Sequence, residues 1–231
     1  MYLGIDIGGS NVRIGEFDSK TSGKLSNIVA FEVDKDFEKA IKKIIQEIRG
    51  ISKSKKIDGI GIALPGLVNT EKGYIESSAN LRSWQKKPIK TILEKEFNTK
   101  LFVKHDVAVA AIGEAFFGFG KNVNKFIYFI WGTGFGGAFV EKVDSKLRIT
   151  SFEPGHQIID WNGIDCPCGQ KGCVEAYIGG RSSEKYYGKP LSEIKDNKTW
   201  NDISERAAHA ILNTLKHYET NLIIFGGGGY K

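Results

Sequence analysis

Cysteine is scarce in this chain of 231 residues: there are three, and all lie between positions 166 and 173. An odd number of cysteines gathered in one short segment excludes a disulfide framework as the basis of the fold. Free thiols of this kind are typical of proteins in a reducing compartment. The cysteines are therefore expected to serve one local purpose.

Long apolar segments and dense basic blocks are also missing. No run of eighteen apolar residues occurs, which excludes a membrane-spanning helix and a membrane partner. A strand-like segment begins at Tyr2, so we expect no signal peptide and a cytoplasmic location. The net charge is +6, but the lysines are dispersed, so we expect no nucleic-acid partner. The 41% hydrophobic residues suit a soluble globular protein with one large domain or two small ones.

What the chain does have is a compact set of metal-ligating side chains. One imidazole and three thiols fall within eighteen residues: His156, Cys166, Cys168 and Cys173. Gly169 and Gly172 allow tight turns between them. Zinc takes a Cys3His set in closed, tetrahedral structural sites, so the pattern predicts structural zinc. The alternative is buried thiols beside an ordinary histidine.

Two carboxylates flank this set without being needed as ligands. Glu153 precedes His156 by three residues, and Glu175 follows Cys173 by two. Carboxylates held rigidly over a pocket suit a ligand with many hydroxyl groups, because each can accept hydrogen bonds from adjacent O–H groups. A sugar is the natural candidate, and solvated surface charges are the alternative.

Two glycine-rich turns join predicted strands. The first is the segment from Asp6 to Asn11, and the second runs from Gly132 to Gly137. Glycine lets backbone amides approach a phosphate without a Cβ in the way, and Asp6 could hold Mg²⁺ through water. Ordinary hairpins are the alternative for both. Because the second turn lies between strands, a dinucleotide-binding fold is not favoured.

Apolar periodicity predicts alternating strands and helices. Strands are expected at 2–7, 11–17, 28–33, 57–64, 101–104, 126–131, 138–140 and 221–225, and helices at 36–52, 88–97, 108–117 and 202–217. Asp106 stands where a helix N-cap would, which alone would carry no chemistry.

The spacing His-x9-Cys-x-Cys-Gly-x2-Gly-Cys-x-Glu closely resembles the signature of the ROK family, named for repressors, open reading frames and sugar kinases. The segments 6–11, 63–68, 78–84 and 132–137 resemble further loops of that family. The resemblance implies an α/β, two-domain, actin-like (ribonuclease H-like) fold. We expect domains at 1–106 and 107–231, the second containing the zinc motif 156–173.

The resemblance also implies roles for individual residues. Asp106 would be the general base that takes a proton from the sugar hydroxyl. Sugar-binding residues would be Asn80, His105, Asp106, Glu153, His156 and Glu175. Residues for ATP and Mg²⁺ would be Asp6, Gly8, Gly9, Ser10, Asn11, Thr133, Gly134, Gly226, Gly227 and Gly228, with the glycine run 226–229 facing the adenosine. His105 departs from the family's usual asparagine, and Asn80 also fits an ordinary turn.

The expected function is ATP-dependent phosphorylation of a hexose or amino sugar by a homodimer with zinc and Mg²⁺. One alternative is a sugar-binding or inactive member of the family, because the segments after the zinc motif are shorter than usual. The other is a sugar-responsive repressor, which we rank last because such proteins carry a DNA-binding segment before the first glycine turn. The sequence names neither the sugar nor the phosphoryl donor, since some relatives use polyphosphate.

Overall fold

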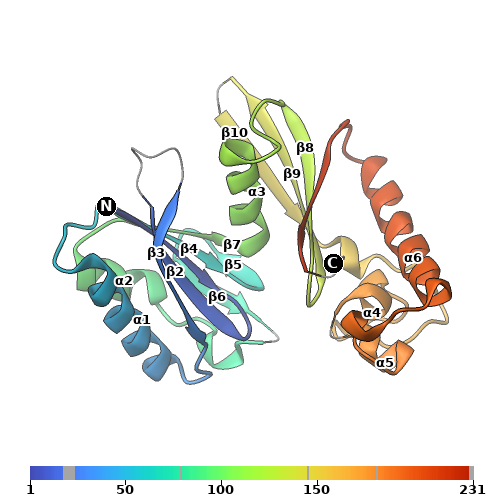
Figure 1. Ribbon diagram of the computed structural model, residues 1–231, viewed down its shortest axis with the longest axis horizontal. Coiled ribbons are helices and arrows are strands. Elements are labelled where there is room, and N and C mark those ends of the chain that lie inside the picture. The colour runs from blue at the N-terminus through green and yellow to red at the C-terminus, as the bar shows by residue number, and fades with distance from the viewer. Residues whose placement is uncertain (18–23, 79, 145, 181, 229–231) are drawn as a thin grey trace. The chain divides into compact units, whose positions relative to one another are not determined.

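The computed structural model describes residues 1–17, 24–78, 80–144, 146–180 and 182–228. Ala79 and Gly229, which the expected loops include, lie outside these ranges. The chain divides into two compact units, Met1–Val109 and Ala110–Lys231 (Figure 1). Helix α3 (Asp106–Phe117) begins in the first unit and continues into the second.

The first unit is a five-stranded mixed sheet in the order β3-β2-β1-β4-β7. Its strands are β1 (Tyr2–Ile7), β2 (Asn11–Phe17), β3 (Leu25–Glu32), β4 (Gly59–Leu64) and β7 (Leu101–His105). A separate hairpin is formed by β5 (Leu67–Asn69) and β6 (Tyr74–Ser77), followed by the 3-10 turn η1 (Arg82–Trp84). The helices α1 (Phe37–Ser52) and α2 (Ile89–Phe97) lie on one face of the sheet (Figure 1).

Alternation along β1 builds the core of this unit. Ile5 and Ile7 are buried between exposed or half-buried neighbours, and they pack with Ile44 and Ile48 from the apolar side of α1. Asp36 caps α1, because its carboxylate accepts the N–H groups of the second and third helical residues. The sheet and α1 are therefore determined by local sequence patterns, namely the alternation along β1 and the cap and apolar face of α1.

The second unit repeats part of this topology in a four-stranded sheet, β10-β9-β8-β11. Its strands are β8 (Lys125–Trp131), β9 (Phe135–Val143), β10 (Lys146–Phe152) and β11 (Ile223–Gly227). In both units the central strand pairs antiparallel with the next strand and parallel with the strand that follows a helix. The expected duplication of strand, turn and strand is confirmed.

Four short helical segments and one long helix, α6, fill the connection between β10 and β11. They are η2 (Pro154–His156), α4 (Val174–Ile178), α5 (Ser183–Tyr187), η3 (Leu191–Glu193) and α6 (Asn197–Leu215). Buried side chains of α4 and α6, including Val174, Tyr177 and Ile203, pack with Ile127 and Phe129 of the sheet. Among the described residues, no helix has both the length and the apolar content to cross a membrane.

Several expected boundaries were wrong. The second glycine turn is shorter than 132–137, because Gly136 and Gly137 already pair with β8 inside β9. Helix α6 begins five residues earlier than 202, after an N-cap at Asp196. Asp106 is the first helical residue of α3 rather than a preceding cap. The β5–β6 hairpin, β10 and α5 were not predicted.

Candidate functional site

Asp106 lies where β7 ends and α3 begins, and its surroundings favour the protonated carboxyl group. Burial raises the pKa of Asp106, and the charge of Asp6 raises it further, while His105 and the N–H of Val107 oppose the shift. The Val107 N–H donates to Asp106 Oδ1 at 2.7 Å, and His105 Nε2 lies 3.2 Å from the same oxygen. Asp106 is therefore a stronger proton acceptor than an ordinary aspartate.

His105 is largely buried, with its side chain 20% exposed. One ring nitrogen faces Asp106, and the other, Nδ1, is buried without a hydrogen-bond partner among the described residues. An unsatisfied buried nitrogen has bonding capacity left for a ligand. This arrangement is consistent with the expected sugar contact.

The first glycine turn lies at the same edge of the sheet as Asp106. Strands β1, β4 and β7 are parallel, so Asp6 and Asp106 both lie at carboxyl ends of strands. The Gly8 N–H donates to the Asn11 carbonyl at 2.8 Å, which closes the turn. Asp6 pairs with Arg13 at 3.1 Å, and both side chains are about half exposed, so a bound Mg²⁺ would compete with that guanidinium.

Lys35 and Asn80 brace this turn. The Lys35 ammonium donates to the carbonyl oxygens of Gly9 and Asn80, the second at 3.1 Å. A Cβ on Gly9 would lie only 2.9 Å from Asn80 Cβ, so glycine is needed for this close approach. Asn80 was predicted as a sugar contact and not as a brace of this turn, and Lys35 was not predicted, because no spacing signal marks a lysine 26 residues from the turn that it contacts.

The second glycine turn has a different brace. Gly132 N donates to the Gly134 carbonyl at 2.9 Å, and Thr133 between them is exposed. The Phe135 N–H, which follows the turn, donates to Glu175 Oε2 at 2.9 Å. Glu175 is therefore held by the protein rather than solvated freely, which argues against the surface-charge alternative for this residue.

The predicted metal ligands are together in space. The ligand atoms of His156, Cys166, Cys168 and Cys173 all lie within 4.8 Å of one another. Cys168 and Cys173 sulfurs are 3.7 Å apart, and Cys166 Sγ lies 3.8 Å from the His156 Nδ1 atom. Tetrahedral zinc with Zn–S bonds of about 2.3 Å separates its sulfur ligands by about 3.8 Å. The two printed separations are therefore close to those that a tetrahedral zinc ion requires.

Two of the three thiols, Cys166 and Cys173, resist ionisation without a cation. Burial raises the pKa of Cys166, and it raises the pKa of Cys173 to about 12, where the neighbouring thiols add to the effect. Metals bind cysteine as thiolate, so a divalent ion would displace these protons. The chemistry of the ligand set and its spacing agree on the same kind of site.

Glu153 immediately precedes the short turn η2, which ends at His156, and the His156 N–H donates to the Glu153 carbonyl at 3.1 Å. The Glu153 side chain is exposed. Because His156 uses Nδ1 on the metal side, its other ring nitrogen is directed away from the thiols by the geometry of the ring. The exposed carboxylate of Glu153 is therefore on a residue only three positions before a member of the metal cluster.

The glycine run after β11 has a packing explanation. Gly227 has a positive φ of 98° and lies against the Trp131 carbonyl, and a Cβ on Gly226 would collide with the Tyr128 hydroxyl. Gly228 meets no described atom at the Cβ position. Gly227 pairs with Trp131, so this run lies beside the second glycine turn. Ordinary packing accounts for Gly226 and Gly227, while Gly228 is open to another role.

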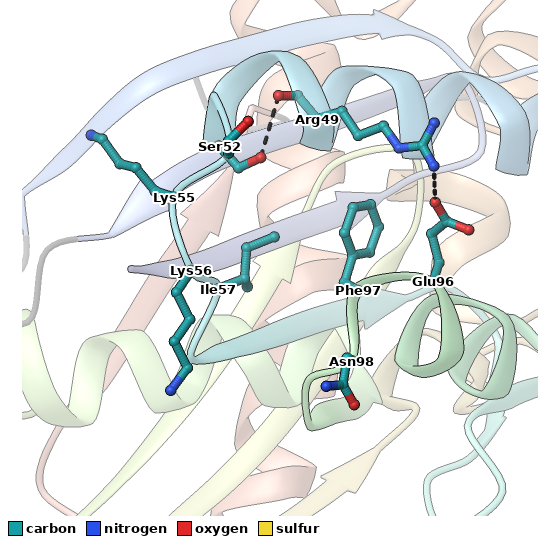
Figure 2. Close-up of a pocket in the computed structure, with 9 residues that line it drawn as sticks. Arg49, Ser52, Lys55, Lys56, Ile57, Glu96, Phe97 and Asn98 are labelled. Carbon is teal, nitrogen blue, oxygen red and sulfur yellow. Dashed lines mark hydrogen bonds and ion pairs between the residues drawn. The ribbon is translucent and has the colours of Figure 1, made fainter.

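A separate pocket lies in the first unit, away from these residues. Figure 2 shows this pocket, of about 530 Å³, where Arg49 of α1 pairs with Glu96 of α2. Ile57, just before β4, lines it. Asp6 and Asp106 lie at the carboxyl ends of strands that run parallel to β4, whereas Ile57 precedes the amino end of β4. The pocket is therefore at the opposite end of these strands. It contains none of the predicted site residues.

The model of the ROK family matches residues 2–230, and the chain belongs to this family. Two solved structures share the fold. A ROK hexokinase from Thermus thermophilus has a TM-score of 0.79 and 23% identity, and the match covers 99% of this chain and 82% of that one. A ROK glucokinase from Streptomyces griseus in complex with glucose and AMPPNP has a TM-score of 0.77 and 22% identity, and the match covers 98% of this chain and 83% of that one. The fold is the actin-like α/β fold of ROK sugar kinases.

Curated relatives include both enzymes and a regulator. A xylose repressor from Caldicellulosiruptor bescii is 28% identical over 213 residues, covering 90% of this chain and 49% of the repressor. A glucokinase from Thermotoga maritima is 29% identical over 189 residues (80% and 59%). An N-acetyl-D-glucosamine kinase from Haemophilus influenzae is 29% identical over 257 residues (99% and 84%). The chain thus spans about half of the repressor and less than two thirds of the glucokinase.

Proposed function

We propose that this chain is an ATP-dependent kinase for a hexose or amino sugar, with Asp106 as the general base. The main support is the raised pKa of Asp106, together with its place at the same edge of the sheet as Asp6 and the first glycine turn. Kinases among the relatives, named for glucose and N-acetyl-D-glucosamine, support the same class of substrate.

In the proposed reaction Asp106 accepts the proton of one sugar hydroxyl as its oxygen attacks the γ-phosphorus of ATP. A new O–P bond forms, the bond from the γ-phosphorus to the bridging oxygen breaks, and ADP leaves. His105, at 3.2 Å from Asp106, orients the carboxylate and offers its second nitrogen to the sugar. Mg²⁺, when bound, neutralises phosphate charge, and Asp6 is the residue that would hold it through water.

The phosphates are proposed to meet the two glycine turns, Gly8 to Asn11 and Thr133 to Gly134, with Gly226 to Gly228 at the adenosine. Asn80, Glu153, His156 and Glu175 would orient the sugar hydroxyls. His156, Cys166, Cys168 and Cys173 would hold a structural zinc ion, since their four ligand atoms gather within 4.8 Å and a Cys3His set is typical of such sites. We also propose a homodimer, which light scattering tests directly.

The test is a coupled ADP-release assay with Mg-ATP and a panel of glucose, mannose, fructose, allose, N-acetylglucosamine and N-acetylmannosamine. Asp106→Asn should lower turnover about 10²- to 10⁴-fold, as expected when a general base is removed. Asp36→Asn is the matched control, because it also removes a carboxylate at the start of a helix and asparagine caps equally well. Unchanged turnover in Asp106→Asn would remove this residue from the base role. Polyphosphate in place of ATP tests the donor.

A sugar-responsive regulator or a non-catalytic sugar-binding protein is the second candidate. The match to a xylose repressor across 90% of this chain favours keeping it. Calorimetric binding of a sugar with no ADP release on any member of the panel would support this reading, whereas turnover on one sugar would establish the kinase.

A further inference from the structure

Glu175 forms a contact inside the second unit that the proposed sugar contact does not explain. Its Oε2 accepts the N–H of Phe135 at 2.9 Å, and the bond is partly buried. Phe135 is the first residue of β9, so this bond holds the backbone where the second glycine turn ends. A hydrogen bond to a charged acceptor away from bulk water is among the stronger ones.

Glycines from separate segments make room for this carboxylate. A Cβ on Gly134 would collide with Glu175 Oε2. A Cβ on Gly155 would lie 3.0 Å from Glu175 Cβ and 2.6 Å from the Phe135 carbonyl. Glycine at both positions lets the Glu175 side chain pass between the turn and η2.

Two further bonds tie the end of α4 and the residues after it to the same turn. The Gly180 N–H donates to the Gly132 carbonyl at 2.9 Å. The indole N–H of Trp131, just before the turn, donates to the Ile178 carbonyl at 2.8 Å. The second glycine turn is therefore held at both ends. Glu175, near the start of α4, holds the residue after it, and Ile178 and Gly180, at and beyond the end of α4, hold the residues where it begins.

The start of α4 is in turn attached to the metal cluster. Cys173 is the residue before the first helical residue of α4, and its thiol is fully buried. The Val174 N–H donates to the Gln157 carbonyl at 2.9 Å, next to His156. Only one residue separates Cys173 from Glu175, so the position of the metal ligands sets the position of this carboxylate.

We infer that Glu175 is a positioning residue that clamps the second glycine turn to the metal cluster, so that metal binding orders the turn proposed to hold ATP phosphates. The clamp itself rests on the hydrogen bonds described above. That its ligand is ATP rests on the proposed function. It assigns Glu175 a role toward the nucleotide in addition to any contact with sugar.

The experiment compares Glu175→Ala and Glu175→Gln, with Glu205→Gln, an exposed glutamate on α6, as the control. Amide hydrogen exchange of residues 132–136, zinc content and binding of a fluorescent ATP analogue are measured on each full-length chain. In Glu175→Ala, exchange should rise and ATP-analogue affinity should fall about tenfold or more, with zinc retained. Glu175→Gln should restore both to near the wild-type values, because the amide oxygen still accepts from Phe135.

The inference is overturned if Glu175→Ala leaves exchange in the turn unchanged, even when the KM for sugar rises. If Glu175→Ala does not fold, removal of the bound metal from the wild-type chain by a chelator still decides: faster exchange at 132–136 supports the clamp, and unchanged exchange there overturns it. If the wild-type chain binds no nucleotide, the proposed function fails, but exchange at Phe135 still tests the clamp by itself.

Discussion

The two glycine turns occupy equivalent places in two related sheets, yet opposite charges hold them. In the first unit the Lys35 ammonium donates to the Gly9 carbonyl, and this contact is exposed. In the second unit the Glu175 carboxylate accepts from the Phe135 N–H, and this contact is partly buried. Repetition of topology therefore does not bring repetition of chemistry.

The difference has an electrostatic consequence for an anionic ligand. A lysine beside a turn adds attraction for phosphate, whereas a carboxylate beside a turn adds repulsion unless its charge is occupied by hydrogen bonds. We expect the first turn to depend mainly on the exposed charge of Lys35 and the second to depend on the buried clamp and the metal cluster. The predictions below separate these two dependences.

Metal removal should have the largest effect and should divide the two turns. Cys168→Ser changes the exposed member of the cysteine cluster, and a structural zinc site is worth about 10 to 16 kcal/mol in small peptides. Amide exchange at 132–136 should accelerate more than about a hundredfold, because local unfolding becomes accessible. Exchange at 8–11 should stay as in the wild type. Equal acceleration in both turns would mean that zinc supports the whole chain and not the second turn in particular.

Methyl groups added to the two turns should be next in effect. Gly134→Ala and Gly9→Ala each force an overpacked contact, expected to lower the free energy of unfolding by about 1 to 3 kcal/mol. Adding Glu175→Ala should recover part of the loss in Gly134→Ala, since the colliding carboxylate is gone. Adding Asn80→Ala should not rescue Gly9→Ala, because alanine keeps the Cβ that lies 2.9 Å away.

Urea unfolding of each single and double variant gives both coupling energies. The expected contrast would be contradicted if Asn80→Ala restored stability to Gly9→Ala, or if Glu175→Ala restored none to Gly134→Ala.

Local patterns explain which parts of this architecture the sequence could predict. The bounds of β1 and β2 were correct, because strict alternation meets a Gly-Gly turn at Gly8 and Gly9. The metal ligands were correctly expected to come together, because they share one short segment of 18 residues. In both cases the information lies within a few residues of the feature.

Contacts between distant segments were not predictable in the same way. Glu175 and Phe135 are 40 residues apart, and nothing in their spacing links them. The exposed edge strand β3 has little apolar alternation, so its start was placed at 28 instead of Leu25. The first turn of α6, from Asn197, has too few apolar residues to show a helical period.

Asp106 should make the stability of the chain depend on pH. Burial raises the pKa of Asp106 above the ordinary value of 3.8, so the folded state holds this proton to higher pH than the unfolded state does. Its contribution to stability is therefore greatest at acid pH and falls as pH rises from 3.8 through the raised pKa. At neutral pH, Asp106→Asn should melt at a higher temperature than the wild type.

The measurement is the difference in melting temperature between Asp106→Asn and wild type at several pH values. The difference should grow with pH through that window and then level off. A difference that shrinks with rising pH would mean that the carboxylate form of Asp106 is stabilised in the fold.

Lys35→Met should have the smallest effect on stability, about 1 kcal/mol or less, because exposed charged contacts are weak and methionine keeps most of the side-chain length. Its effect on ATP-analogue affinity should be larger at low salt and fade as ionic strength rises, since the Debye length is only about 8 Å at 0.15 M. Glu175→Ala should weaken affinity at every salt concentration, because its contact is partly buried. Titrations at about 0.02 M and 0.5 M salt compare the two. If Lys35→Met were insensitive to salt, the lysine would act by shaping the turn and the contrast in charge between the two turns would carry no function.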